Sequence, residues 1–192
     1  MQPLILHTSE VFTLTDDELF QLCAANRDLR IERNSQGNLI LMSPAGSKTS
    51  RRNSTLNRRL GNWNEATHLG EVFDSSGGFL LSSGAMRSPD AAWIPTERLG
   101  QFSEEEQEKF LPLCPDFVIE LSSPSDRMKE LQKKMQEWMD NGCRLGWLID
   151  PVEEKTYVYR ANGENSVVDS FDEALSGEDV LPGFVLELSE LR

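Results

Sequence analysis

Pro115-Asp116-Phe117-Val118-Ile119-Glu120-Leu121-Ser122-Ser123 is an apolar stretch with an acidic residue near its centre. From Asp116 onward its side chains alternate with a period of two, which is typical of a strand and places Glu120 on the same side as Val118. An ionised carboxylate inside an apolar strand is costly unless a cation or strong donors meet it. Glu120 is therefore either part of a structural salt bridge or a functional residue, and the spacing alone leaves both readings open.

A helix is expected directly after this strand. Ser123-Pro124-Ser125-Asp126 combines a serine cap, a proline at the first helical position and an acid in the first turn, and Asn141-Gly142 is typical of a helix end. Lys134 lies at the border of the apolar stripe, one turn before Trp138, so its ammonium can lie near the carboxylates of the sheet. The alternative is an exposed ion pair with Glu130, four residues earlier.

The flanking segments predict the rest of a sheet. Residues 144–149 form an apolar strand, and residues 156–160 are its expected antiparallel neighbour. A helix between two strands indicates a crossover connection. Upstream, Ser88-Pro89-Asp90 leads into a strand that Asp90 opens, because the residue before a proline is extended.

The remaining segments predict further helices and strands. A capping box at Thr15 to Glu18 starts a helix that runs to about residue 26, and residues 29–33 and 38–42 read as a hairpin. Residues 47–66 form a candidate helix, and residues 71–74 and 78–81 are expected as short strands on either side of a turn. We also expect a short acidic helix over residues 103–110 and an edge strand or short helix within residues 177–188.

The candidate helix over residues 47–66 carries the one concentrated positive surface that we find in the sequence. Five basic residues fall on one arc of this helix, separate from its apolar arc: Lys48, Arg51, Arg52, Arg58 and Arg59. The arc is either a solvated helix face or a phosphate-facing strip beside a site, as in a DNA-binding protein.

Composition places the chain among soluble globular proteins. With 192 residues, 38% hydrophobic and 27% charged, we expect one domain over residues 1–192, located in the cytoplasm, with no membrane span and no signal segment. The three cysteines have no paired spacing and are expected to be buried thiols, and the two histidines to be surface or cap residues. A net charge of −13 weighs against nonspecific binding to a polyanion.

Asp90 and Glu120 indicate a specific chemistry. Two carboxylates at the ends of neighbouring strands make a hard oxygen site of the kind that Mg²⁺ or Mn²⁺ prefers, and the carbonyl of Leu121 is a candidate third ligand. Such an ion lowers the pKa of bound water and neutralises charge on a phosphate. A nearby lysine would orient the water or stabilise the phosphorus centre.

These residues resemble a known family. Pro89-Asp90, Glu120-Leu121-Ser122 and the segment from Lys134 to Trp138 look like the PD-(D/E)XK nuclease superfamily, and specifically its bacterial Uma family of restriction-endonuclease-like proteins. The resemblance extends through residues 42–44, 88–93, 115–125, 146–151 and 176–184, so it covers nearly the whole chain. It implies an α/β fold with a restriction-endonuclease-like core, in which helices flank a central mixed β-sheet, and here an N-terminal helix and β-hairpin form an extension.

The resemblance also implies roles for individual residues. Asp90 and Glu120 would be the metal ligands, and Lys134 would replace the usual lysine two residues after the acid, where this chain has Ser122. Ser122 or Gln136 would add a hydrogen bond. We therefore expect an Mg²⁺-dependent (or Mn²⁺-dependent) DNA endonuclease, by analogy a homodimer. The alternatives are an inactive nucleic-acid-binding or protein-interaction module on the same fold, and a buried structural network around Glu120 and Lys134.

Overall fold

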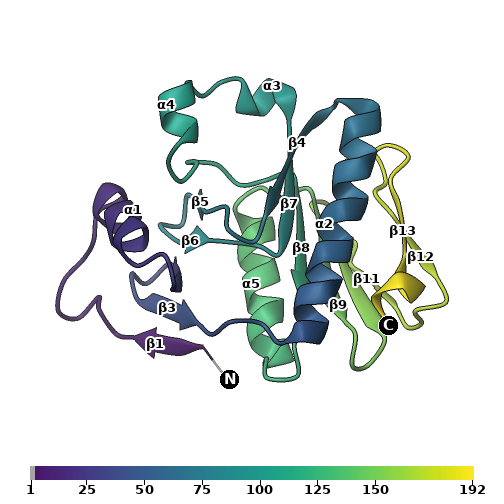
Figure 1. Cartoon of the computed structure of the whole chain (residues 1–192), viewed down its shortest axis with the longest axis horizontal. Helices are drawn as coiled ribbons and strands as arrows, with labels where there is room; N and C mark the ends of the chain where they lie inside the picture. The colour runs from purple at the N-terminus through teal and green to yellow at the C-terminus, as the bar shows by residue number, and fades with distance from the viewer. Residues whose placement is uncertain (1–2) are drawn as a thin grey trace.

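A six-stranded mixed sheet forms the centre of the computed structural model, which describes residues 3–192 (Figure 1). Its strand order is β11-β10-β9-β8-β7-β4, in which β8 (Phe117–Leu121) and β9 (Leu145–Asp150) are parallel and all other neighbours are antiparallel. Helix α5 (Met128–Asp140) connects the two parallel strands, as the crossover pattern predicts. The remaining strands are β4 (Gly70–Asp74), β7 (Ala91–Pro95), β10 (Lys155–Arg160) and β11 (Ser166–Val168).

Each face of this sheet buries a separate hydrophobic core. Phe117, Ile119 and Leu121 pack against α2 (Ser47–Thr67) and the C-terminal segment, whereas Val118 packs against α5 on the other face. This division confirms the period-two alternation read from the sequence. Glu120 consequently lies on the face that α5 covers, and the predicted mixed sheet flanked by helices is confirmed.

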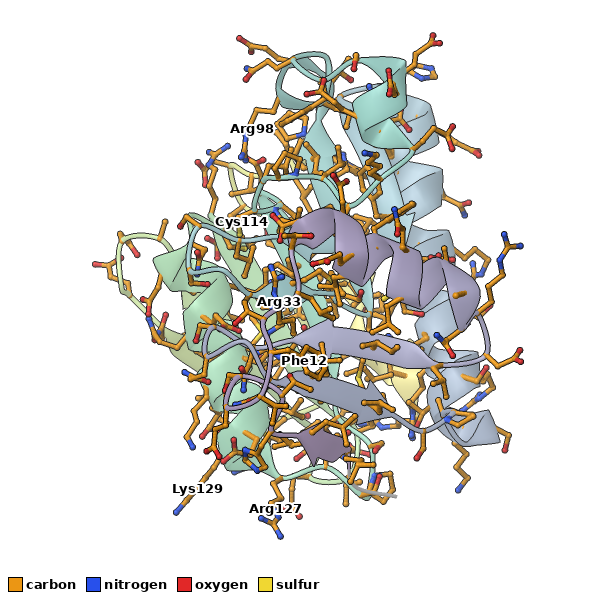
Figure 2. The ribbon with its side chains drawn as sticks, turned by 90° about the vertical axis from the view of Figure 1, so that its left-hand side faces the viewer. Phe12, Arg33, Arg98, Cys114, Arg127 and Lys129 are labelled. Carbon is orange, nitrogen blue, oxygen red and sulfur yellow. The ribbon has the colours of Figure 1, made fainter. Side chains whose placement is uncertain are left out.

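The first three strands and the later β5–β6 pair build a second, five-stranded antiparallel sheet in the order β1-β3-β2-β6-β5, here called the N-terminal sheet. Its strands are β1 (Leu4–Leu6), β2 (Arg30–Arg33), β3 (Leu39–Met42), β5 (Phe79–Leu80) and β6 (Met86–Arg87). The expected hairpin is the β2–β3 pair, and α1 (Asp16–Ala25) packs on this sheet through the buried Leu19 (Figure 2). Arg33 ties the helix to the sheet by hydrogen bonds to the Leu14 carbonyl at 3.0 Å and to Asp16 at 2.5 Å.

The C-terminal segment covers the α2 side of the central sheet. It contains the paired strands β12 (Ala174–Ser176) and β13 (Val185–Glu187) and the 3₁₀-helix η1 (Leu188–Leu191), whose Leu188 and Leu191 are fully buried. The connection between β7 and β8 holds the short helices α3 (Thr96–Leu99) and α4 (Glu104–Gln107). No helix in residues 3–192 has the length and apolarity needed to cross a bilayer.

One detail of the sequence prediction is wrong. The helix expected to start at Ser123 starts at Met128, because the Ser123 N–H donates to Asp126 Oδ2 at 2.8 Å and closes a separate turn before α5. The short strands expected on either side of the Ser75–Gly77 turn are present as β4 and β5. They belong to different sheets, because β4 pairs with β7 in the central sheet and β5 pairs with β6 in the N-terminal sheet.

The cysteines and histidines lie largely as expected. Cys114 and Cys143 are buried and Cys23 is half-buried, all three as free thiols. His68 ends α2 as a left-handed cap with φ of 54°, and His7 is exposed.

Candidate active site

Asp90 and Glu120 lie side by side at one end of the central sheet. Asp90 directly precedes β7, one residue beyond the Ala91–Ile119 pair, and therefore stands opposite Glu120 in β8. The Asp90 N–H donates to the Ile119 carbonyl at 3.0 Å, and the Leu121 N–H donates to Asp90 Oδ2 at 2.9 Å. Asp90 thus contacts the backbone on both sides of Glu120, and two acids from separate strands share one location.

Helix α2 fixes Asp90 from the other side. Asn53 Nδ2 donates to Asp90 Oδ1 at 2.9 Å, and Asn57 Nδ2, one helical turn later, donates to the Asp90 carbonyl at 3.0 Å. Both carboxylate oxygens of Asp90 are therefore oriented by donors. The Oδ1 atoms of Asn53 and Asn57 are buried and accept no hydrogen bond within the described residues, so two further oxygen acceptors lie beside Asp90.

Two side chains of α5 contact Glu120. Its Oε1 accepts a hydrogen bond from Trp138 Nε1 at 2.8 Å and forms an ion pair with Lys134 Nζ at 2.8 Å. Both side chains reach it because residues four apart lie on the same helix face. The expected alternative pairing of Lys134 with Glu130 does not form, since Glu130 pairs with Lys133 at 2.9 Å. The structure therefore brings Asp90, Glu120 and Lys134 together, as the sequence predicts.

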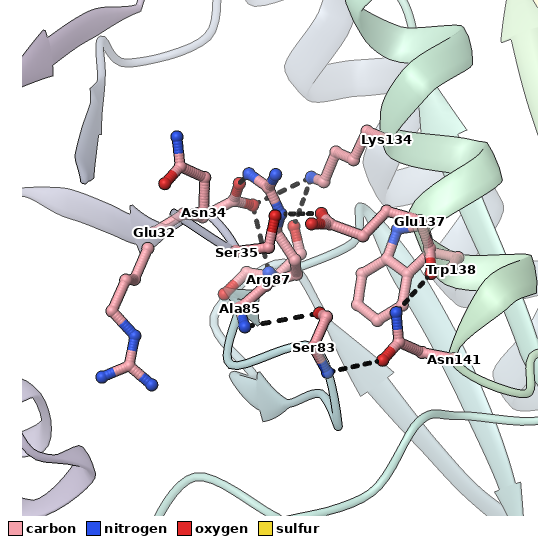
Figure 3. A network of polar contacts seen from close by, with 12 residues as sticks. Glu32, Asn34, Ser35, Ser83, Ala85, Arg87, Lys134, Glu137, Trp138 and Asn141 are labelled. Carbon is pink, nitrogen blue, oxygen red and sulfur yellow. Dashed lines mark hydrogen bonds and ion pairs between the residues drawn. The ribbon is translucent and has the colours of Figure 1, made fainter. Parts of the chain in front are cut away.

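A second carboxylate, Glu32 of β2, reaches the same lysine (Figure 3). Glu32 Oε1 accepts from Lys134 Nζ at 2.8 Å and from the Ser88 N–H at 3.1 Å, while its Oε2 accepts from Arg87 Nη1 at 2.9 Å. Arg87 Nε in turn donates to Glu137 Oε2 on α5 at 2.5 Å. The N-terminal sheet is thereby joined to the central sheet through a continuous polar network.

The two carboxylates that share Lys134 have opposite pKa shifts. Burial raises the pKa of Glu120 from 4.5 to about 7; the charge of Lys134 opposes this rise, and the charges of Asp90 and Glu32 add to it. Burial also acts to raise the pKa of Glu32, but the charges of Lys134 and Arg87 outweigh it and lower that pKa to about 2. Burial would lower the pKa of Lys134, yet the two carboxylates raise it, so Lys134 stays an ammonium. Glu32 is therefore the firmer ion-pair partner.

The charges of the network fit a divalent cation. Three carboxylates, those of Glu32, Glu120 and Glu137, share the two basic side chains of Arg87 and Lys134, and the charge of Asp90 also acts on Glu120. Burial is the main cause of the raised pKa of Glu120, and the negative charges of Asp90 and Glu32 add to it against the opposing charge of Lys134. A bound cation would favour the ionised carboxylates. Within residues 3–192 no three side chains of His, Cys, Asp or Glu cluster closely enough to hold a metal by themselves. Asp90 and Glu120 would thus need a backbone oxygen, for which the Leu121 carbonyl is the candidate.

Comparison with known proteins assigns this arrangement to a family. The sequence profile of Uma2, described as "Putative restriction endonuclease", matches residues 16–189. The chain is a member of the Uma2 family. The match runs from α1 into η1, so it includes the central sheet, the N-terminal sheet apart from β1, and every residue of the network described above. No curated protein matches the chain.

A solved structure has the fold of this Uma2 protein. A crystal structure described as "a putative nuclease belonging to DUF820 from Anabaena variabilis ATCC 29413" superposes with a TM-score of 0.75 and 21% sequence identity. The superposition covers 93% of this chain and 97% of the other. At this identity the similarity establishes that the two proteins share a fold, and not that they share an activity.

Two residues expected to support the site lie differently in this Uma2 protein. Gln136 is exposed and donates to Asp140 Oδ1 at 2.8 Å, because it lies on the outer face of α5, two residues from Lys134. The expected hydrogen bond from Gln136 to the site is therefore wrong. Ser122 is buried, but its hydroxyl donates to Asp150 Oδ1 on β9 at 3.1 Å and so turns toward the neighbouring strand.

The basic arc of α2 is largely engaged within the chain. Arg51 and Arg52 donate to the carbonyls of Arg192 and Leu191, and Arg59 forms a two-pronged ion pair with Glu190, which Arg58 approaches to 4.0 Å. Lys48 is exposed in the first turn of α2. Most of these basic side chains hold the C-terminal segment against α2. Their role is therefore closer to a structural one than to that of a free, phosphate-binding surface.

Sequence reasoning missed Glu32 and Arg87. The alternation of Leu29 to Arg33 places Glu32 on the polar face of a hairpin, where solvent is the default expectation. In the structure Glu32 instead contacts Lys134 of α5, Arg87 of β6 and the Ser88 N–H, and it is 2% exposed. No local signal distinguishes it from a solvated glutamate, because its partners lie 55 and 102 residues away.

Proposed function

We propose that this Uma2 protein is a DNA endonuclease that hydrolyses phosphodiester bonds with Mg²⁺ or Mn²⁺. The observation that carries the proposal is that Asp90, Glu120 and Lys134, from two strands and one helix, meet at one end of the sheet. Membership in a family described as restriction endonucleases supports the same class of reaction.

In the proposed site the Asp90 and Glu120 carboxylates and the Leu121 carbonyl would hold the cation. When bound, the ion supplies a water of lowered pKa and neutralises negative charge on the phosphate. Asn53 and the Leu121 N–H keep the Asp90 carboxylate in one orientation before the ion binds, which avoids reorganisation. Trp138 does the same for Glu120.

Lys134 provides the positive charge beside these ligands. Its ammonium is held among oxygen atoms of Glu32, Glu120 and Ser88, and its side chain is 13% exposed. In this position Lys134 can donate a hydrogen bond to the attacking water or to a phosphate oxygen as negative charge develops. Ser122 and Gln136 have no part in the proposed reaction, because their hydrogen bonds are made elsewhere.

A DNA cleavage assay tests this proposal, with two neighbouring lysines of α5 as the test and control positions. Purified protein is incubated with plasmid DNA and Mg²⁺, beside the Asp90→Asn, Lys134→Met and Lys133→Met variants. We expect Asp90→Asn and Lys134→Met to lose at least about 100-fold in rate, the range that positioned acid–base groups contribute. Lys133→Met should keep full activity, because Lys133 pairs with Glu130 in solvent. Equal cleavage by all four proteins would show that a contaminating nuclease is responsible and would overturn the proposal.

The second candidate function is a module that keeps the fold without turnover. The burial of Glu120, of which only 3% is exposed, and the engagement of the α2 arginines by the C-terminal segment favour it. A protein that takes up no divalent cation and binds DNA without cleaving it would support this second function over the first.

The proposed enzyme acts as a homodimer, because one such site cuts one strand and a break in both strands needs two. Sedimentation of the purified protein with and without a DNA duplex tests this part separately. A monomer in both conditions that still makes double-strand breaks would contradict the dimer.

A further inference from the structure

We infer that Glu32 is a positioning residue of the proposed metal site, which holds the Lys134 ammonium away from Glu120 when Glu120 binds a cation. The inference rests on the proposed function, since it assumes that Asp90 and Glu120 are metal ligands. It makes the N-terminal sheet a part of the site and not only an extension of the fold.

The contacts of Lys134 carry the first step. Its Nζ donates to Glu32 Oε1 at 2.8 Å and to the Ser88 carbonyl at 3.1 Å, and it forms an ion pair with Glu120 Oε1 at 2.8 Å. An ammonium paired with Glu120 alone would compete with a cation for the same oxygen. With Glu32 and Ser88 present, Lys134 keeps two hydrogen-bond acceptors when the Glu120 carboxylate binds a cation instead.

The second step is that Glu32 is held by more hydrogen bonds than Glu120. It accepts from Arg87 and from the Ser88 N–H besides Lys134, it is 2% exposed, and Arg87 is itself held by Glu137. Glu120 accepts hydrogen bonds through Oε1 only, among the contacts of residues 3–192. The carboxylate that stays with the lysine is therefore Glu32, and the carboxylate with an oxygen left for a ligand is Glu120.

Mn²⁺ binding, measured by electron paramagnetic resonance or calorimetry without DNA, tests the inference. We expect Glu32→Gln to weaken Mn²⁺ binding about tenfold or more, the range typical of residues that orient metal ligands. Glu32→Asp keeps the charge and should recover part of the affinity. Glu130→Gln is the matched control, because it removes a carboxylate of the same helix that pairs only with the exposed Lys133, and it should bind as wild type.

A double-mutant cycle separates positioning from simple charge. If Glu32 acts through Lys134, then Glu32→Gln should have little effect on Mn²⁺ affinity in a Lys134→Met background. An equal loss in both backgrounds would show that Glu32 contributes only its negative charge and would overturn the inference. Circular dichroism of each variant confirms that the folded protein is being titrated.

The outcomes for the two proposals are distinct. Wild-type protein that binds no Mn²⁺ overturns the metal site and the inference with it. Wild-type protein that binds Mn²⁺, together with a folded Glu32→Gln variant that binds it equally well, overturns the role of Glu32 and leaves the proposed function standing.

Discussion

Replacing Glu120 by glutamine is expected to stabilise the protein at pH 8, although the change removes an ion pair with Lys134. Burial and neighbouring negative charges raise the pKa of Glu120 from 4.5 to about 7, so the folded protein favours the neutral carboxyl. The stability that this neutral form contributes is fully present below pH 4.5 and is lost as the pH rises through 7. A neutral glutamine avoids that loss.

The magnitude follows from the same values. A rise in pKa from 4.5 to about 7 corresponds to about 3 kcal/mol in the free energy of unfolding, which is the upper limit of the gain at pH 8. For Glu32 the pKa shift, and therefore the effect of pH on stability, has the opposite sign. Lys134 and Arg87 lower the pKa of Glu32 from 4.5 to about 2. The ionised form of Glu32 therefore contributes up to about 3 kcal/mol to the free energy of unfolding above pH 4.5, and this contribution is lost as the pH falls toward 2. Glu32→Gln should therefore destabilise the protein at pH 8.

Urea unfolding followed by tryptophan fluorescence at pH 8, 6 and 4.5 measures both effects. The gain from Glu120→Gln should shrink steadily as the pH is lowered to 4.5. If Glu120→Gln instead destabilised the protein at pH 8 as strongly as Glu32→Gln does, Glu120 would be an ordinary structural ion-pair partner. That result would refute the reasoning that the site is held in a state of excess negative charge.

Three further predictions concern the surroundings of the site. Gly70→Ala should destabilise the protein by about 3 kcal/mol or more in urea titrations, because a Cβ there would lie 2.2 Å from the Ile94 carbonyl oxygen. Gly61→Ala is the matched control: it lies in the middle of α2 with open space around it, so it should stabilise the protein by about 0.5–1 kcal/mol. Trp138→Phe should cost about 3 kcal/mol, measured in the same way, through the lost hydrogen bond to Glu120 and the smaller ring; a loss below about 1 kcal/mol would contradict it. Mg²⁺ affinity should rise between pH 6 and pH 8 in calorimetric titrations, because the cation requires Glu120 without its proton, and an affinity independent of pH would count against Glu120 as a ligand.

Local patterns predicted the central part of the fold and the proposed site. The alternation from Phe117 to Leu121 placed Glu120 on the face that α5 covers, since the side-chain period of a strand depends only on the backbone. The position of Lys134 at the border of the apolar stripe, one turn before Trp138, placed its ammonium near the sheet for the same geometric reason.

Interactions between distant segments could not be predicted in this way. Glu32 reads as a solvated residue of a hairpin and is buried only because the N-terminal sheet packs against the central one. The arginines of α2 read as a free basic arc, and their partners in η1 lie more than 100 residues later. In each case the local sequence fixes which way a side chain points, and the tertiary fold decides what it meets.

A crystal structure of the protein soaked with Mn²⁺, with anomalous diffraction recorded for the metal, tests the central claim most directly. We predict one anomalous peak at the end of the central sheet, bound by Asp90, Glu120 and the Leu121 carbonyl, with Lys134 still on Glu32. A peak elsewhere, or no peak while Glu120 remains bound to Lys134 and Trp138 alone, would contradict the proposed site.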